Sequence, residues 1–526
     1  MTPLVEFEED PASAHRRLCD QRRKESARFE SWDRRIGDAR LVVFLLVLGA
    51  GVLAFWTKSI DFVWVVPPVL TFVALVVAHD SVDRKWRRAR RAAAFHERGL
   101  ARVEGRWAGL GEPGTRYLDE DHPYAADLDL FGPGSLFQRL STARTRVGED
   151  TLASWLKDPA SPERIRWRQE AQTELRGRLD LREDMALLGE EAGAGIDVDS
   201  VIAWAKEPSR LSSKGLEVLA HVLGTLGLIL LVGWLADLIS VWAFLVVVAL
   251  EIVFSIGVAK RVRHVAGHVD RAGHDLSVLS QVLERIERES FQCSALRELR
   301  ERLDQKGALA SRRIARVCWI ISLMEYRKNA VFALFGAVML WTTRLAYLIE
   351  RWRVANGQDI ERWLAIVGEF EALCSLAAFA FEEVNGSLPE FTEGASPSLE
   401  AAGLGHPLLP VDQCVVNDVS LGGRSPRLLL VSGSNMSGKS TLLRTIGVNV
   451  VLAQAGTIVR AKRFRLTPLM PGATLRVQDS LRAGRSRFYA EVARLRQLLD
   501  LASERPPLLF LLDEVLHGTN SHDRLI

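Results

Sequence analysis

The feature that most restricts how this chain can fold is a glycine-rich loop near its C-terminal end. Residues 433–440 read G-x-x-x-x-G-K-S, after an apolar segment at 428–432 that predicts a strand and before an amphipathic pattern that predicts a helix. The two glycines allow the backbone to turn sharply, so that its N–H groups can face phosphate oxygens. The helix N-terminus adds the positive end of a dipole. The pattern therefore predicts a nucleotide-phosphate site within an α/β domain.

Each loop residue has an expected part in this site. Lys439 would place its charge beside the β- and γ-phosphates, and Ser440 would offer its hydroxyl to Mg²⁺. ATP and Mg²⁺ are therefore the expected cofactors. The predicted nucleotide-binding residues of the loop are Gly433, Ser434, Asn435, Met436, Ser437, Gly438, Lys439, Ser440 and Thr441.

A second apolar segment, 508–512, ends in two acidic residues, Asp513 and Glu514. Two prolines before it end the preceding helix and favour a strand. Downstream of a phosphate-binding loop, this arrangement predicts that Asp513 holds the Mg²⁺ shell, directly or through water, and that Glu514 positions or activates the attacking water. Glu514 and Lys439 are accordingly the predicted catalytic residues of an ATPase.

Two apolar hairpins, at about 41–78 and 218–259, have halves close to the roughly 17–25 residues that a helix needs to cross a bilayer. The alternative is that they are buried helices of a large soluble core. Glu251 lies inside the second hairpin, where a charge is costly, so it should face a neighbouring helix or be protonated. The apolar run 331–341 is too short to span and is predicted to be a buried core helix.

Flanking charges predict the orientation of both hairpins. The loops between their halves contain almost no Lys or Arg, which places both hairpin ends on the cytoplasmic side. We expect a multi-pass protein of the inner membrane with its ATPase domain in the cytoplasm. The run 84–91 sets topology, or alternatively contacts anionic lipid or nucleic acid. The flanking basic residues are Arg34, Arg35, Arg40, Arg84, Lys85, Arg87, Arg88, Arg90, Arg91, Arg210, Lys214, Lys260, Arg261 and Arg263.

Bulk composition excludes little. There are 68 basic and 65 acidic residues, so net charge argues neither for nor against a nucleic-acid partner. Five scattered cysteines without a C-x-x-C pair indicate neither a disulfide framework nor a zinc site. The first 39 residues are charged and polar, so no export signal is expected.

Changes in sequence texture suggest three regions. Residues 1–127 contain charged helices and the first hairpin. Residues 128–398 have apolar positions at helical spacing and contain the second hairpin. Residues 399–526 alternate short apolar strands with helices, as an α/β P-loop domain does. The chain stops soon after the Asp-Glu pair, so this domain is expected to be incomplete at the C-terminus.

Several motifs resemble the MutS family. The loop 433–441 resembles the MutS P-loop, including its Asn-Met pair. Further similar stretches are Gly405-His-Pro-Leu-Leu, Ala453-Gln-Ala-Gly, Val459-Arg-Ala, Asp479-Ser-Leu, Gly484-Arg-Ser-Arg-Phe-Tyr-Ala-Glu and Asp513-Glu-Val-Leu-His-Gly-Thr-Asn-Ser-His-Asp. Weaker likeness to the MutS helical core begins near Leu136-Phe-Gln-Arg-Leu, so the resemblance covers roughly 128–526 and is strongest after 399.

The resemblance implies a homodimer with composite ATP sites, in which Ser486 would reach the γ-phosphate bound by the partner subunit. Its alternative is a helix-capping serine. DNA, contacted nonspecifically, is an implied partner, together with the membrane bilayer. The chain has no room for the mismatch-reading and connector domains, and the family's adenine-stacking aromatic falls near Cys414. The family's further strand and its His are missing before Ile526, which indicates a fragment or an incomplete ATPase.

Three functions are compatible with these features. The first is a membrane-anchored MutS-like ATPase that acts as a dimeric clamp, on DNA by resemblance and so related to DNA repair. The second is a non-catalytic, nucleotide-gated scaffold or DNA tether at the membrane. The third, an ABC-type transporter, is disfavoured because no Leu-Ser-Gly-Gly-Gln stretch precedes the Asp-Glu pair.

Overall fold

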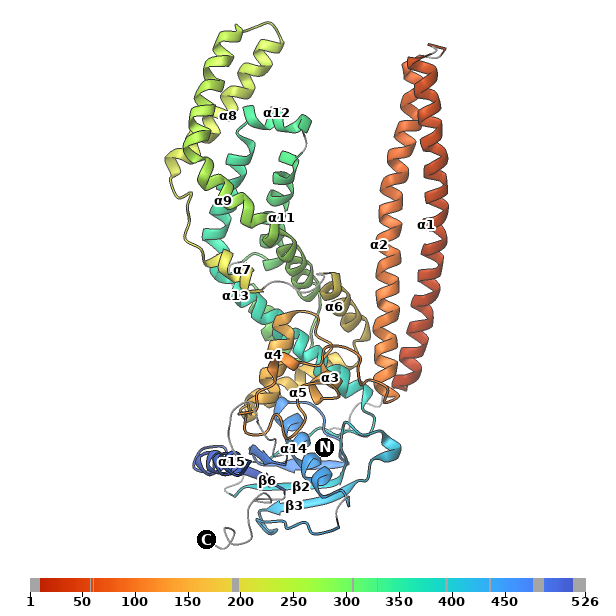
Figure 1. Ribbon diagram of the computed structural model, residues 1–526, viewed down its shortest axis with the longest axis vertical. Helices are drawn as coiled ribbons and strands as arrows, with labels where there is room; N and C mark the ends of the chain where they lie inside the picture. The colour runs from red at the N-terminus through yellow and green to blue at the C-terminus, as the bar shows by residue number, and fades with distance from the viewer. Residues whose placement is uncertain are drawn as a thin grey trace.

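The computed structural model describes the chain except for residues 1–9, 57, 60, 192–197, 305–306, 329, 393–395, 435–436, 476–486 and 514–526. Figure 1 shows three levels along the long axis of the molecule. The β-strands and α14 lie at one end, packed helices form the middle, and two helical hairpins project in the same direction, away from the strands. This arrangement separates the long apolar segments from the predicted nucleotide loop.

The first hairpin consists of α1 (Pro11–Phe55), the 3-10 helix η1 (Phe62–Val65) and α2 (Val66–Val103). α1 begins where the Asp10 side chain accepts a hydrogen bond from the Ser13 amide at 3.1 Å. The two predicted helices are confirmed. Their outer parts expose large apolar side chains: Leu41, Val42, Phe44, Leu45, Leu46, Leu48, Val52, Leu53, Phe55, Trp56, Val63, Trp64, Val66, Val69, Leu70, Val73, Val76 and Val77.

The second hairpin consists of α8 (Lys214–Leu235) and α9 (Val241–Glu287). Glu251 of α9 is only 3% exposed, and a Cβ atom added to Gly227 of α8 would lie 2.4 Å from its carboxyl. The expectation that Glu251 faces a neighbouring helix is confirmed. The outer part of this hairpin also exposes large apolar side chains: Val218, Leu219, Val222, Leu226, Ile229, Val232, Trp234, Leu235, Leu238, Trp242, Leu245, Val246, Leu250, Ile252, Val253 and Ile256.

The middle of the molecule is built around α13 (Trp341–Glu382), whose large side chains Tyr347, Trp363 and Phe370 are fully buried. It packs against α4, α5, α7, α9 and α11, which confirms the predicted helical region. The other elements of this level are η2 (Thr115–Tyr117), α3 (Leu136–Leu140), α4 (Arg146–Lys157), α5 (Pro162–Arg176), α6 (Leu179–Glu191), α7 (Val198–Lys206), α10 (Ser294–Glu301), α11 (Ala310–Glu325) and η3 (Tyr326–Lys328).

Five helices in the described part of the chain are long and apolar enough to cross a membrane. The most apolar window of α13 is 89% buried inside the protein, whereas the windows in α1, α2, α8 and α9 are 0%, 11%, 28% and 17% buried. Protein side chains therefore already cover the apolar surface of α13. The other four helices leave theirs uncovered, and they are the four halves of the predicted hairpins.

The short helix α12 (Ala330–Val338) corrects one prediction. Segment 331–341 was expected to be a buried core helix, and a short helix is present, but Phe335 is 48% exposed and Ala337 is also exposed. The reason is geometric, because α12 crosses the ends of α11 and α13 instead of entering the bundle that they form (Figure 1).

The C-terminal level contains two sheets, as the predicted α/β texture requires. Strands β1 (Glu390–Phe391), β2 (Ser398–Leu404), β3 (Asn417–Gly422) and β4 (Arg463–Leu466) pair in the order β1-β4-β2-β3, with η4 (Val411–Gln413) between β2 and β3. Strands β5 (Met470–Thr474) and β6 (Leu508–Leu512) form a parallel pair. Helix α14 (Lys439–Ala455) packs against β5, β6, α4 and α5, and α15 (Arg487–Leu501) packs against β5 and β6.

The base of the first hairpin is attached to the end of α13 by buried charges, here called the Glu382 cluster. Arg102 of α2 pairs with Glu382 at 2.6 Å, and Arg139 of α3 pairs with it at 3.0 Å. His15 of α1 lies 3.7 Å from the same carboxylate and 3.1 Å from His96 of α2, measured between their Nδ1 atoms. The cluster therefore joins α1, α2, α3 and α13 at one point.

Burial decides the protonation of this cluster. Burial lowers the pKa of His15 to about 3, although Glu382 opposes the shift. Burial alone would raise the pKa of Glu382, but the Arg102 and Arg139 guanidiniums outweigh it and hold that pKa at about 2. At neutral pH the cluster thus contains a neutral His15 and a charged Glu382.

Candidate nucleotide-binding site

The predicted phosphate loop leads directly into the N-terminus of α14. Gly438, just before the helix, has φ +89°, a left-handed conformation that glycine adopts without strain. No described side chain caps this helix end. The amides of the first turn of α14 are therefore open to an anion.

Lys439 folds back over the loop. Its Nζ donates hydrogen bonds to the carbonyl oxygens of Gly433, at 2.7 Å, and Ser434, at 3.1 Å. The loop is tight there, since a Cβ atom added to Gly433 would lie 2.7 Å from Ser437 Oγ. Phosphate oxygens can replace the two carbonyls as partners of the ammonium, as the predicted role of Lys439 requires.

The two predicted Mg²⁺ ligands lie in direct contact. Ser440 Oγ donates a hydrogen bond to Asp513 Oδ2. Asp513 directly follows β6, and its amide donates to the Thr474 carbonyl at 3.0 Å, so the end of the β5–β6 pair fixes its place. A hydroxyl and a carboxylate suit Mg²⁺, which prefers oxygen ligands and retains waters and phosphate oxygens as the others.

No larger metal site exists among the described residues, because no three His, Cys, Asp or Glu side chains come together there. The five cysteines are free thiols. A divalent cation at Ser440 and Asp513 would therefore depend on the bound nucleotide for part of its coordination shell.

The segment before the loop differs from the prediction. Residues 428–432 form no strand, and Leu428, Leu429 and Leu430 are 64%, 46% and 87% exposed. A parallel strand is stable when neighbouring strands pair with it and helices cover its faces. In the described part of the chain β6 pairs with β5 alone, so 428–432 has no partner strand and its apolar residues remain at the surface.

Four predicted site residues, Asn435, Met436, Ser486 and Glu514, lie outside the described residues. The catalytic role of Glu514 and the role of Ser486 in a partner's site accordingly remain predictions. Thr441 is exposed within the first turn of α14. The structure thus brings together Gly433, Ser434, Ser437, Gly438, Lys439, Ser440, Thr441 and Asp513 at one helix end.

Asn449, which the sequence analysis did not single out, and Arg460, which lies in the quoted Val459-Arg-Ala stretch, hold α14 in place. The buried Asn449 side chain donates to the Gly405 carbonyl at 3.0 Å and accepts from the Arg460 amide at 2.9 Å. The Arg460 guanidinium donates to the His406 carbonyl at 3.0 Å and lies 3.8 Å from Glu383. Asn449 is a polar residue within the apolar run of α14, and this pattern could have predicted a buried side chain with hydrogen-bond partners.

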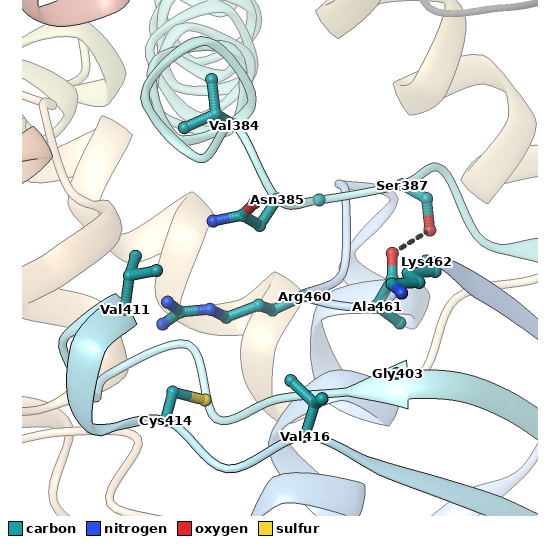
Figure 2. Close-up of a pocket in the computed structure, with 11 residues that line it drawn as sticks. Val384, Asn385, Ser387, Gly403, Val411, Cys414, Val416, Arg460, Ala461 and Lys462 are labelled. Atoms are coloured by element: carbon teal, nitrogen blue, oxygen red, sulfur yellow. Dashed lines mark hydrogen bonds between the residues drawn. The ribbon is translucent and has the colours of Figure 1, made fainter.

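A cavity of about 460 Å³ lies beside this junction. Figure 2 shows Arg460 reaching across it between Val411, Cys414 and Asn385. Among the described residues, its lining contains none of the phosphate loop, so it is distinct from the contact of Ser440 with Asp513. Cys414, near which the resemblance places the family's base-stacking aromatic, contributes a thiol that accepts from the His406 amide at 3.2 Å. This wall supplies no ring for a base.

Residues 429–526 match the family model described as MutS domain V. The C-terminal segment resembles MutS. Over 178 residues this chain is 35% identical to the DNA mismatch repair protein MSH6 of Arabidopsis thaliana, covering 31% of this chain and 13% of that protein. The DNA mismatch repair protein MutS of Clostridium botulinum is 30% identical over 179 residues, 32% of this chain and 18% of that protein.

A third relative, the DNA mismatch repair protein Msh6 of Gallus gallus, is 33% identical over 196 residues, which is 34% of this chain and 14% of that protein. The matched part therefore spans less than a fifth of the length of these relatives. These similarities support a relation to the MutS family and a P-loop ATPase domain at the C-terminal end. Each of these relatives matches about a third of this chain.

Proposed function

We propose that the chain is a membrane-anchored ATPase of the MutS type, which binds Mg·ATP at residues 433–441 and hydrolyses it. The observation that carries this proposal is the contact of Ser440 with Asp513 at the open N-terminus of α14. A phosphate loop alone would bind many anions. The added carboxylate beside the loop hydroxyl creates a place for the cation that accompanies a nucleoside triphosphate.

The chemistry follows from these positions. The amides of α14 and the Lys439 ammonium would hold the β- and γ-phosphates, while Ser440 and Asp513 would hold Mg²⁺. Held there, the cation would neutralise charge on the triphosphate. Glu514, next to Asp513 in sequence, would orient the attacking water. By the resemblance of its motifs to the MutS family, two copies of the chain would pair, Ser486 of one would complete the site of the other, and the dimer would act as a clamp on DNA.

Anchoring in the membrane is supported by the two hairpins. Both point away from the phosphate loop in the same direction (Figure 1), and both expose apolar side chains along lengths suited to a bilayer. The basic run 84–91 lies just below the apolar part of α2. A cytoplasmic ATPase domain at the inner membrane follows from the positive-inside rule.

The test uses the full chain in detergent or lipid nanodiscs. Mg²⁺-dependent ATP turnover is expected, and Lys439→Ala should reduce it by about 100-fold or more, as loss of a charge-stabilising group does in other active sites. Lys24→Ala, an exposed lysine of α1, is the matched control and should leave turnover unchanged. Turnover that survives Lys439→Ala would refute the assignment of the site.

One observation favours the second function, a non-catalytic nucleotide-gated scaffold or DNA tether. Residues 428–432 lie outside the sheets, and a loop on an unpaired segment is less rigidly placed for catalysis. This function predicts ATP binding that depends on Lys439, no measurable hydrolysis, and no effect of Glu514→Gln. Loss of turnover in Glu514→Gln with retained ATP binding would instead establish catalysis.

DNA binding is tested separately. Binding to duplex DNA that weakens steeply as salt rises would support contact with phosphates. If no binding to duplex DNA is detected even at low salt, DNA is removed from the proposal. The proposed ATPase activity and membrane attachment would not be affected by that result.

A further inference from the structure

The short helix α12 (Ala330–Val338) has no polar side, because its nine residues read AVFALFGAV. A helix on the surface of a soluble protein normally turns a polar face to water. Here Phe335 is 48% exposed and Ala337 is exposed as well. The exposed face of α12 is therefore apolar.

The end of α12 packs tightly into α8. A Cβ atom added to Gly224 would lie 2.4 Å from the Met339 carbonyl oxygen, and one added to Gly227 would lie 2.9 Å from the Val338 carbonyl oxygen. Two glycines of α8 thus form the contact surface for the end of α12. This contact fixes the position of α12 along the axis of α8, here called its level on the second hairpin.

That level lies inside the apolar part of α8. His221 is the last ionisable residue before the apolar run, and Gly224 and Gly227 follow it by three and six positions. At the rise of an α-helix they lie roughly 4 and 9 Å beyond it along the helix axis. Helices that lie in a membrane surface bury their apolar face by about 5–10 Å, which is the same range.

Glu251 lies at this level too. Its carboxyl and the Val338 carbonyl both lie against Gly227, and Glu251 is 3% exposed although its neighbours Leu250 and Ile252 are 53% and 55% exposed. The end of α12 therefore helps to shield this acid from whatever surrounds the hairpin, as a polar group within a bilayer requires.

The flanks of α12 have the composition of a membrane interface. Trp319 on α11 and Tyr326 on η3 are 62% and 55% exposed, and aromatic rings of this kind concentrate at the headgroup level. Glu325 at the end of α11 is also exposed beside Tyr326, as a residue at a membrane interface can be. α12 itself has nine residues, too few to span a bilayer. Figure 1 shows α12 running across the direction of α11 and α13.

We propose that α12 is an interfacial helix that lies in the cytoplasmic leaflet of the bilayer, with Phe335 and Ala337 against acyl chains. This inference rests on the proposed membrane anchoring of the second hairpin and adds a third lipid contact between the two hairpins. It names the lipid bilayer, and not a protein, as the partner that covers the exposed face of α12.

The test measures depth in vesicles of phosphatidylcholine and phosphatidylglycerol. The full chain, with its five cysteines replaced by serine or alanine, carries one fluorescent NBD label at Phe335→Cys or Ala337→Cys. Ile229→Cys, exposed in the middle of α8, is the deep control, and Leu499→Cys, exposed on α15, is the water control. Lipids with a quenching doxyl group near the headgroup or deep in the acyl chain report the position of each label.

Labels on α12 should lose emission mainly with the shallow quencher, the label at Ile229 mainly with the deep quencher, and the label at Leu499 with neither. If Ile229 is quenched and both α12 labels behave like Leu499, the interfacial position is wrong while the anchoring stands. If both α12 labels follow the deep quencher, α12 is inserted and not interfacial. If Ile229 is not quenched, the anchoring of the second hairpin fails, and this inference fails with it.

Discussion

At the nucleotide loop, the charged side chains lie near the surface and have partners that a ligand can replace. Lys439 donates hydrogen bonds to two loop carbonyls, and Ser440 donates one to Asp513. At the Glu382 cluster, the carboxylate is fully enclosed and carries two guanidiniums at 2.6 and 3.0 Å. The comparison separates charge arranged to receive a ligand from charge arranged to join helices. Substitutions at the two places should therefore affect different measurements.

The largest effect on stability is expected at the cluster. Glu382→Gln keeps the side-chain shape but leaves Arg102 and Arg139 buried without their counter-charge. Removing one partner of a buried ion pair typically costs about 3–5 kcal/mol. Thermal unfolding of the chain in detergent, followed by circular dichroism, should show a clearly lower midpoint. An unchanged midpoint would mean that the cluster does not hold the first hairpin to α13.

A second effect concerns pH. His15 has a folded-state pKa of about 3 against an ordinary 6.5, so below about pH 6.5 the unfolded chain binds a proton that the folded chain does not. Stability should fall as pH drops through this range, by up to about 1.4 kcal/mol per pH unit. Glu382, with a pKa of about 2 against 4.5, adds to the loss below about pH 4.5.

The measurement is the unfolding midpoint between roughly pH 7.5 and pH 5, above the titration of ordinary carboxylates. His15→Asn should flatten the slope of midpoint against pH, whatever its effect at neutral pH. His96, Arg102, Arg182 and Glu382 all act on His15 and remain in the variant. Equal slopes in the parent and the variant would show that His15 is not the group that titrates.

A smaller effect is expected at the loop, and on ligand binding instead of stability. Ser440→Ala removes the hydroxyl that contacts Asp513, and a hydrogen bond to a charged group contributes about 1.5–3 kcal/mol. The Mg²⁺ concentration needed for half-maximal ATP binding should rise roughly tenfold or more. The unfolding midpoint without nucleotide should stay close to that of the parent, because Ser440 and Asp513 are only half-buried and water can replace the lost hydroxyl as a partner of the carboxylate. A large drop in the midpoint would mean that Ser440 stabilises the fold, as the Glu382 cluster does, and would contradict the distinction between the two places.

The smallest effect is expected at a surface ion pair on the same hairpin. Arg23 and Glu97 lie 2.7 Å apart, but their side chains are 61% and 46% exposed, and such pairs contribute little. Glu97→Gln should leave the midpoint within error and serves as the matched control for Glu382→Gln. If the unfolding midpoints of both variants dropped by the same amount, burial would not explain a special contribution of the Glu382 cluster to stability.

Local patterns predicted much of this structure. Length and apolar composition were sufficient for the two hairpins, because a helix of such residues needs no distant partner to be recognised. The spacing of glycine, lysine and serine was sufficient to place a loop before α14. The apolar segment that ends at Asp513 was sufficient to predict that this residue lies near Ser440. The failures share a cause. Whether 428–432 becomes a strand, or whether α12 is buried, depends on neighbours supplied by other segments.

The Glu382 cluster could not be predicted for the same reason. Its members come from α1, α2, α3 and α13, and Arg139 and Glu382 are 243 positions apart. Nothing near His15 in the sequence marks it as buried, and only the packing of α1 on α2 and α13 excludes water from its ring. Asn449 and Arg460 likewise gained their roles from contacts between α14 and the loops beside β2.

Both ends of α13 are tied to segments that we assign to the bilayer. Its last residue, Glu382, holds the base of the α1–α2 hairpin through Arg102, and its beginning packs against α8 and follows α12. In the proposed membrane arrangement, a tilt of α13 would therefore move one hairpin relative to the other within the plane of the bilayer. The distance between the two hairpins should therefore report the tilt of α13, and it can be measured with labels that lie outside the ATPase domain.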